Sequence, residues 1–178
     1  HKGRPSGEYE GIRLLNIPTL RTGGMNAFLY SVFAAVRTLF GKYDIIHFHA
    51  EGPCIMIWLP GLFGRKTVAT IHGLDWQRAK WGKAASWLIR LGEKSAAKNA
   101  DEIIVLSRNM QKYFYDVYGR RVKYIPNGIS RPPLREISEI RKRYGLEKDS
   151  YILFVARIVP EKGLHYLIRA FRLLDTEK

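Results

Sequence analysis

The sequence predicts an α/β protein with a doubly wound, mostly parallel sheet of the Rossmann-like kind. Three observations support this fold class. Short apolar runs alternate with longer segments of helical apolar spacing, most runs are apolar throughout, and glycine, proline or asparagine marks many boundaries. Strands that read as continuously apolar are buried on both faces, and strands joined through helices run parallel.

The first half of the chain supplies three strands and two helices to this pattern. Residues 11–17 form a largely apolar run that ends at a proline, and residues 25–40 repeat apolar positions at helical spacing. The short, mostly apolar run 44–48 predicts a buried strand. Residues 53–63 predict a helix closed by a glycine, and the β-branched stretch 66–71 predicts the next strand.

The second half continues the alternation. A long helix is predicted over residues 77–98, a strand over 102–106, and a helix over 108–118 that a glycine stops. Residues 122–125 predict a strand that ends at a Pro-Asn-Gly turn. The remaining predicted elements are a helix, a strand and a helix, over residues 138–144, 151–156 and 164–174.

The composition of the chain narrows the classes of partner. Of its 178 residues, 30 are Lys or Arg and 16 are Asp or Glu, a net charge of +14. Such an excess favours nucleic acid, acidic lipid or phosphorylated small molecules. The single cysteine, Cys54, excludes an internal disulfide and fits a reducing compartment. No apolar run approaches the roughly 18 residues of a membrane span, and no ligand spacing indicates a metal site.

Polar residues stand in all five loops that follow the predicted strands from residue 44 onward. They are His49, Glu51, His72, Asp75, Ser107, Asn127, Arg157 and Lys162. Ligands of such sheets bind at the carboxyl ends of the strands, so this pattern predicts a binding edge. From the alternation along the strand we expect His47 and His49 on opposite faces, with His47 packed and His49 in the cleft.

Two cations on the last loop suit an anionic group. The Arg157 guanidinium can bind two phosphate oxygens, and Lys162 adds a point charge. Gly163, where the next helix begins, allows close approach of a diphosphate to the helix N-terminus. The alternative is a pair of solvated cations on a basic protein.

His72 and its neighbours form a second group of residues that could contact a substrate. A neutral imidazole beside Asp75 can hydrogen-bond a substrate hydroxyl or accept a proton. The alternative is a capping or packing histidine. Gly23 and Gly24 could cradle a phosphate, but glycines before a helix are weak evidence.

The predicted helix over residues 77–98 carries a basic stripe with one tryptophan. Its members share spacings of three or four residues: Lys80, Lys83, Trp87, Arg90, Lys94 and Lys98. We expect the neighbouring arc to face the sheet; it contains Trp81, Ala84, Leu88, Leu91 and Ser95. A basic stripe of this kind suits an anionic membrane surface, and the alternative is a solvated helix face.

Five segments together resemble family 4 of the retaining, nucleotide-sugar-dependent glycosyltransferases, which have the GT-B fold of two facing Rossmann-like domains. The segments are DIIHFHA (44–50), TVATIHGLDWQRAKW (67–81), ADEIIVLS (100–107), YIPNGI (124–129) and VARIVPEKGLHYLIRAF (155–171). The last two resemble the family's "PNG" hinge and its R…KG donor motif. The HGLDWQRAKW run is similar to a subgroup that includes rhamnosyltransferases of bacterial polysaccharide assembly.

The resemblance implies roles for individual residues. Arg157 and Lys162 would bind the donor diphosphate, and His72 would contact the transferred sugar near its anomeric carbon. Ser107 and Asn127 would lie near the cleft between domains. The resemblance further implies a nucleotide-diphosphate sugar donor, a saccharide or lipid-linked acceptor, retention through front-face attack, and no metal or other cofactor. The expected location is cytoplasmic, peripheral on the inner membrane face.

The resemblance also implies a domain organisation with departures from the family pattern. Residues 1–130 would form part of the acceptor-side domain, 131–148 a linker, and 149–178 the first βα unit of the donor domain. The chain begins with His1 rather than Met, so we expect a piece of a longer protein that is inactive alone. Ala156 stands where the family has a glycine, and the family's acidic pair is not in the sequence.

Two other classes of function remain open at this point. One is a basic nucleic-acid-binding module, although no aromatic stacking platform or recognition-helix pattern appears and no nucleic-acid partner is expected. The other is a different GT-B enzyme, such as a phosphorylase or epimerase, which would also bind phosphate groups.

Overall fold

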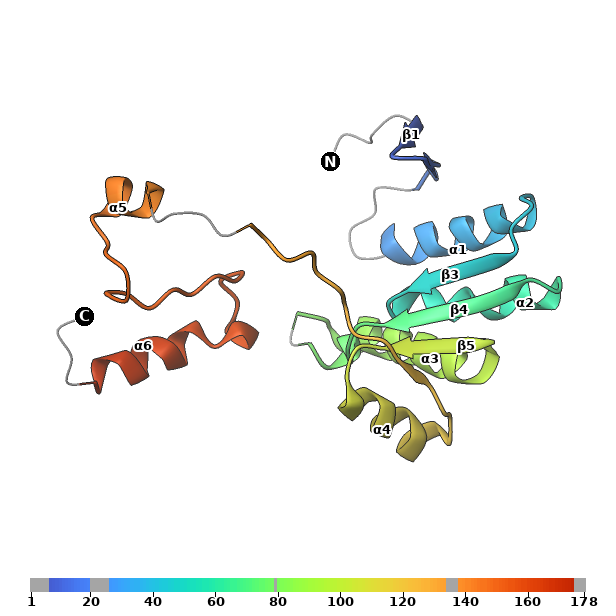
Figure 1. Ribbon diagram of the computed structural model, residues 1–178. Coiled ribbons are helices and arrows are strands. Elements are labelled where there is room, and N and C mark those ends of the chain that lie inside the picture. Colours follow the sequence, from blue (N-terminus) through green and yellow to red (C-terminus); the bar gives the residue numbers. More distant parts are fainter. Residues whose placement is uncertain (1–6, 20–25, 79, 134–137, 175–178) are drawn as a thin grey trace. The chain divides into compact units, whose positions relative to one another are not determined.

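The computed structural model describes residues 7–19, 26–78, 80–133 and 138–174. The chain divides into two compact units, His1–Gly128 and Ile129–Lys178, and each is described here by itself. Figure 1 labels the elements of both units. Gly23 and Gly24, the weak phosphate-site candidate, lie outside the described residues.

Unit 1 is built on four parallel strands in the order β3-β4-β5-β6. Their bounds are Ile45–His49 for β3, Lys66–Ile71 for β4, Glu102–Val105 for β5 and Lys123–Tyr124 for β6. The β3–β4 register runs from Ile45 opposite Lys66 to His49 opposite Thr70. The α/β fold class with a parallel sheet is therefore confirmed, and the carboxyl ends of the strands meet at one edge.

Helices in unit 1 follow the predicted alternation. They are α1 (Asn26–Leu39), η2 (Gly52–Met56), α2 (Trp58–Leu62), η3 (Asp75–Gln77), α3 (Lys83–Asn99) and α4 (Arg108–Tyr118). The helix predicted over 77–98 begins later than expected because Gly82 is extended and serves as its N-cap. The ends of α4 are set locally, since the Ser107 hydroxyl accepts from Met110 N–H and Gly119 closes the helix in the left-handed conformation.

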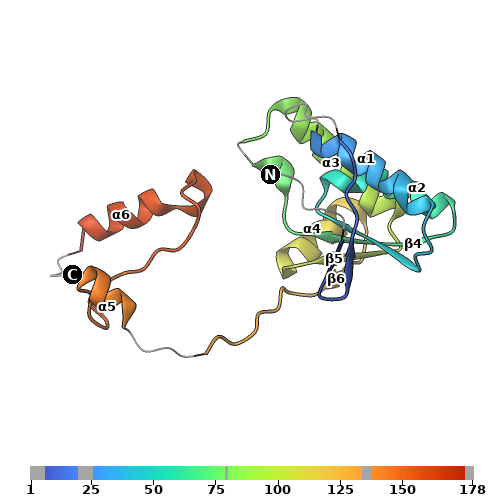
Figure 2. The same ribbon diagram turned by 90° about the horizontal axis from the view of Figure 1, so that it is seen from above.

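The core lies between the sheet and one layer of helices. The strand residues that face this layer are Ile46, Phe48, Ala69, Ile71, Ile103 and Val105, all buried. In Figure 2, α1, α2 and α3 lie next to one another in this layer. On β3 the residues that alternate with the buried ones are exposed; Ile45, for example, is 60% exposed. Because crossovers between parallel strands are right-handed, sequential strand order places successive helices on the same face.

The N-terminal segment forms a hairpin rather than part of the parallel sheet. β1 (Gly7–Tyr9) and β2 (Ile12–Leu14) pair in antiparallel fashion as a separate two-stranded sheet. Both residues of the connecting turn, Glu10 and Gly11, have positive φ, as a type I′ turn requires. The single strand predicted over residues 11–17 is therefore shorter, and its partner is its own hairpin neighbour.

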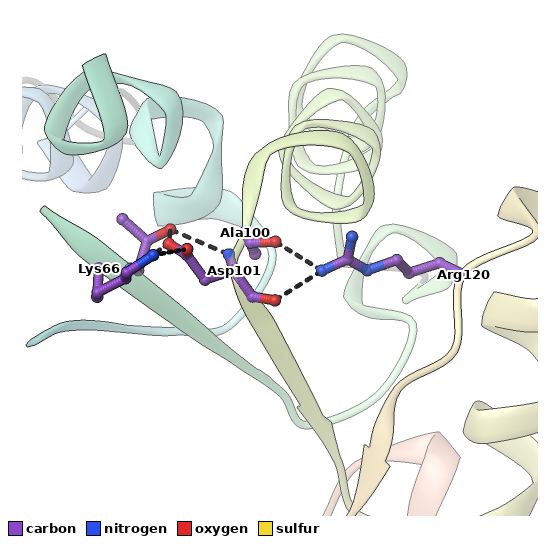
Figure 3. A network of polar contacts seen from close by, with 5 residues as sticks. Lys66, Ala100, Asp101 and Arg120 are labelled. Carbon is purple, nitrogen blue, oxygen red and sulfur yellow. Dashed lines mark hydrogen bonds and ion pairs between the residues drawn. The ribbon is translucent and has the colours of Figure 1, made fainter. Parts of the chain in front are cut away.

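A polar network fixes the amino edge of the sheet, opposite the carboxyl edge (Figure 3). Asp101 accepts from Thr67 N–H at 2.8 Å and pairs with Lys66 Nζ at 3.1 Å. The Thr67 N–H and then Lys66 lower the pKa of Asp101. Arg120 donates to the carbonyls of Ala100 and Asp101 at 2.6 and 2.9 Å. These contacts tie α4 and the start of β5 to β4.

Unit 2 contains α5 (Glu139–Tyr144), η4 (Pro160–Lys162) and α6 (Leu164–Arg172). The strand predicted over residues 151–156 is not formed, because no other strand of this unit lies beside it among the described residues. Apolar side chains of that segment and α6 instead line a cavity of about 650 Å³. No described helix in either unit is long and apolar enough to cross a bilayer.

Gly92 permits the close contact between α3 and η2. A Cβ atom at this position would lie 2.0 Å from the carbonyl oxygen of Glu51, and Gly92 is buried. A methyl group therefore cannot enter without a shift of backbone on one side of the contact. The glycine is required by packing rather than by its backbone torsion angles.

We expect Gly92→Ala to lower the free energy of unfolding by about 2 to 3 kcal/mol, because the new methyl group overpacks a backbone contact. Urea unfolding measures this change. Gly61→Ala is the matched control: Gly61 is also helical, but its added Cβ meets nothing within 4 Å. Equal unfolding midpoints for the Gly92 variant and the unchanged protein would contradict the prediction.

Candidate functional site

The carboxyl edge of the sheet brings two predicted site residues together. His49 ends β3 and His72 follows β4, and their Nδ1 and Nε2 atoms lie 3.4 Å apart. Their rings are stacked with centroids 5.7 Å apart. Because the parallel register places His49 opposite Thr70, two residues before His72, this contact follows directly from the strand pairing.

His47 lies on the same face of the sheet as His49, so the expectation of opposite faces is wrong. Their ring centroids are 4.2 Å apart, as a strand period of two residues requires. His47 Nε2 also contacts Thr70 Oγ1 at 2.8 Å, and His47 is exposed rather than packed. Partial burial, followed by the neighbouring His49 and His72, lowers the pKa of His47.

The buried carboxyl group of Glu51 holds the loop after β4 by a hydrogen bond. Asp75 N–H donates to Glu51 Oε2 at 2.8 Å, while Asp75 Oδ1 pairs with Arg78 Nη2 at the same distance. Glu51 has no exposed surface, so its predicted place in the open cleft is wrong. The backbone turns inward there because Ala50 adopts a positive φ of 70°.

A second buried acid, Glu93 on α3, was not predicted from the sequence. It accepts from Trp76 Nε1 at 3.0 Å and from the hydroxyls of Tyr113 and Tyr118 on α4. Burial, then Glu93 through hydrogen bonding and charge, raises the pKa of Glu51 to about 9. Burial and the contact with Glu93 raise the pKa of Tyr113 to about 12. One sequence feature could have indicated that Glu93 is buried: it stands between Gly92 and Ala96, which lie on the buried side of the amphipathic helix α3.

A cleft of about 290 Å³ opens beside Asp75. Its walls come from α1, the start of η2 and the start of α3, and include Phe28, Tyr30, Ala50, Trp81 and Leu88. The Trp81 indole N–H is buried and has no acceptor among the described residues. The cleft thus has largely apolar and aromatic walls, with Asp75 and Trp81 among them, a lining suited to an organic ligand.

The other predicted cleft residues lie in separate places. Ser107 caps α4, so its hydroxyl already has a structural partner. Asn127 is exposed in the loop after β6, directly before Gly128, the last residue of unit 1.

The donor-side candidates belong to unit 2. Arg157 and Lys162 are exposed on one turn, which closes through hydrogen bonds from Val159 N–H to Arg157 O and from Lys162 N–H to Val159 O. Gly163 has a φ of 71° and is the N-cap of α6. Only glycine takes that conformation without strain.

The basic stripe on α3 is exposed. Lys83, Arg90, Lys94 and Lys98 are open to solvent, and Trp87 is 62% exposed. Lys80 precedes the helix and lies over the Trp81 ring, so its expected helical position is wrong. The arc expected to face the sheet is also displaced, because Ala84 is exposed whereas Gly92, Glu93 and Ala96 are the buried residues. The close packing of Gly92 against the Glu51 backbone lies on this buried side.

Within the described ranges, no group of three His, Cys, Asp or Glu residues is arranged to hold a metal ion.

Comparison with known proteins finds a matching family model for each of the two units. Residues 1–131 match the model of Glycosyltransferase Family 4, and residues 136–178 match that of Glycosyl transferases group 1. Among similar curated proteins, an uncharacterised Bacillus subtilis glycosyltransferase, YqgM, is 31% identical over 137 residues, covering 75% of this chain and 36% of the relative. An uncharacterised glycosyltransferase of Methanocaldococcus jannaschii is 24% identical over 172 residues, covering 94% and 45%.

A third relative has a named reaction. It is a GDP-mannose-dependent alpha-(1-6)-phosphatidylinositol monomannoside mannosyltransferase of Mycolicibacterium smegmatis, 28% identical over 150 residues, covering 79% of this chain and 38% of the relative. The chain spans less than half the length of these three relatives.

We expect Glu51→Gln to weaken the pH dependence of stability. With its pKa raised from 4.5 to about 9, Glu51 keeps in the folded state a proton that the unfolded chain loses. The stabilising contribution is full below pH 4.5 and is lost as pH rises toward 9, so stability should fall across this window. A glutamine side chain does not titrate, and urea midpoints between about pH 5 and pH 8.5 should therefore fall less for the variant.

The control for this experiment is Glu102→Gln, which neutralises an exposed glutamate on β5. It should leave the pH dependence of stability unchanged. A Glu51 variant with the same slope as the unchanged protein would show that Glu51 does not hold the proton.

Proposed function

This chain belongs to glycosyltransferase family 4, and from that premise we propose that it serves transfer of a sugar from a nucleotide-diphosphate sugar to a saccharide or lipid-linked acceptor, with retention of anomeric configuration. Unit 1 supplies the acceptor side and unit 2 begins the donor side. The family assignment favours transfer over the phosphorylase, epimerase and nucleic-acid alternatives.

The observation that carries the proposal is the position of His72 in unit 1. It follows β4 at the carboxyl edge of a parallel sheet, where ligands of such sheets bind, and it precedes Asp75 in the wall of the cleft. An imidazole there can hydrogen-bond a hydroxyl of the transferred sugar. Its contact with His49 restricts its orientation, which is what a positioning hydrogen bond needs.

On the donor side, chemistry supports a diphosphate at the Arg157–Gly163 turn. Both cations are exposed and free of ion pairs among the described residues, so their charges are available to an anion. An arginine fork and a lysine can offset charge that develops on a nucleotide leaving group. Such stabilisation lets the leaving phosphate assist attack from the same face, the proposed route to retention.

We further propose that the acceptor is presented at the cytoplasmic face of a membrane, in assembly of a cell-surface polysaccharide or glycolipid. The exposed cations of α3 and Trp87 form a surface suited to anionic lipid. The mycobacterial relative, whose name specifies a phosphatidylinositol mannoside, supports a lipid-linked acceptor.

We expect His72→Ala and Lys162→Ala to lower turnover in the full-length enzyme, each by roughly a hundredfold, because each removes a contact to the reacting groups. Nucleotide release in a screen of sugar donors provides the measurement. Lys148→Ala is the control, since Lys148 is an exposed cation of unit 2 outside the turn. Unchanged turnover in both site variants would overturn the site assignment.

For the membrane surface, we expect Lys94→Gln combined with Lys98→Gln to weaken binding to anionic vesicles by about thirtyfold, since each lysine contributes about 1 kcal/mol near such a surface. Co-sedimentation with phosphatidylserine-containing and neutral vesicles measures this. The charge-matched control is Arg121→Gln combined with Lys123→Gln, both exposed but outside α3. Equal losses for the two pairs would indicate a general charge effect and no defined surface.

A further inference from the structure

Two buried carboxyl groups converge on one short segment of unit 1. Glu51 reaches it from the turn after β3 and accepts the backbone N–H of Asp75 at 2.8 Å. Glu93 reaches it from α3 and accepts the indole N–H of Trp76 at 3.0 Å. Both glutamates are fully buried, and both hydrogen bonds end on adjacent residues of η3.

Fold stability alone does not explain this arrangement. Burying two carboxyl groups close together is costly, and well-packed apolar side chains of similar size usually serve a core as well or better. The surroundings are built around the acids: Tyr113 and Tyr118 both donate to Glu93 Oε1, and Gly92 lets the Glu51 backbone approach α3. The turn after β3, α3 and α4 therefore all contribute to holding one loop.

The loop held in this way carries the chemistry of the proposed function. It begins at His72, which contacts His49, and continues to Asp75, which lines the 290 Å³ cleft. Glu51 thus holds Asp75 by its backbone N–H, while the Asp75 carboxylate pairs with Arg78. A change of a few tenths of an ångström in this loop would move Asp75 relative to the other cleft walls.

We propose that Glu51 and Glu93 are positioning residues for the acceptor side of the site: Glu51 holds the backbone of Asp75, and Glu93 holds the indole of Trp76. The inference rests on the proposed glycosyl transfer for its kinetic consequence. It goes further in assigning acceptor affinity, rather than donor affinity, to a pair of side chains that touch neither substrate.

The test uses the full-length enzyme with four substitutions. Glu51→Leu removes the acceptor for Asp75 N–H, whereas Glu51→Gln keeps an oxygen in its place. Trp76→Phe removes the indole N–H but keeps an aromatic ring. Trp58→Phe, on α2 and 41% exposed, is the matched control. KM is measured separately for donor and acceptor, together with hydrogen exchange of the amides in residues 72–77.

We expect Glu51→Leu and Trp76→Phe to raise the acceptor KM about tenfold, the effect of one lost hydrogen bond. The donor KM should be unchanged, because His72 is oriented by His49 rather than by the two glutamates. Amide exchange in the segment should accelerate by a similar factor. Glu51→Gln should restore both readouts to within about twofold of the unchanged enzyme, and Trp58→Phe should alter neither. A purely structural role predicts equal changes in both KM values and exchange that accelerates throughout unit 1.

Several outcomes would overturn the inference. An unchanged acceptor KM in Trp76→Phe and Glu51→Leu would do so, as would a parallel rise in donor KM. If Glu51→Leu does not fold, Trp76→Phe and Glu51→Gln still decide the question. If the unchanged enzyme transfers no sugar, the proposed function fails, while the exchange measurements still show whether the two glutamates hold the segment.

Discussion

The packing of α3 against the turn after β3 is the constraint on which unit 1 depends. Gly92 brings the helix backbone against the carbonyl of Glu51, and this approach places Glu93 beneath the loop that follows β4. With a larger residue at position 92, the helix would stand farther from the sheet. The hydrogen bonds from Trp76, Tyr113 and Tyr118 would then lose their common acceptor.

The two edges of the sheet differ: structural contacts gather at the amino edge and the candidate site residues at the carboxyl edge. At the amino edge, Asp101 and Arg120 satisfy backbone and side-chain groups of neighbouring elements. At the carboxyl edge, parallel register brings His49 to His72, and Asp75 in the same loop lines a cavity. In unit 2 the two candidate cations, Arg157 and Lys162, lie on the turn before α6.

Local signals in the sequence predicted much of this structure. The strand runs, the end of α4 at Gly119, and the position of His72 at a strand end all depend on residues near one another in the chain. Register then follows from parallel pairing. The prediction for His47 is wrong because side chains two residues apart along a strand lie on the same face of the sheet, beside each other.

Other features depend on partners distant in sequence and could not be predicted locally. The position of Glu93 between Gly92 and Ala96 is a local signal, but its three donors come from α4 and η3 and cannot be inferred from α3 alone. Glu51 reads as a loop residue until the inward turn at Ala50 buries it. The run 151–156 has strand character, but a strand also requires a neighbour, and none lies beside it in unit 2 among the described residues.

The left-handed conformation of Ala50 has a consequence for substitution at this position. A methyl-bearing residue there costs roughly 1 to 2 kcal/mol relative to a right-handed conformation, and glycine would avoid that cost. Glycine would also give the unfolded chain more freedom, a penalty of about 0.5 to 1 kcal/mol that offsets part of the gain. Glycine should therefore be tolerated here, and its main effect should be the loss of one methyl group from the wall of the cleft.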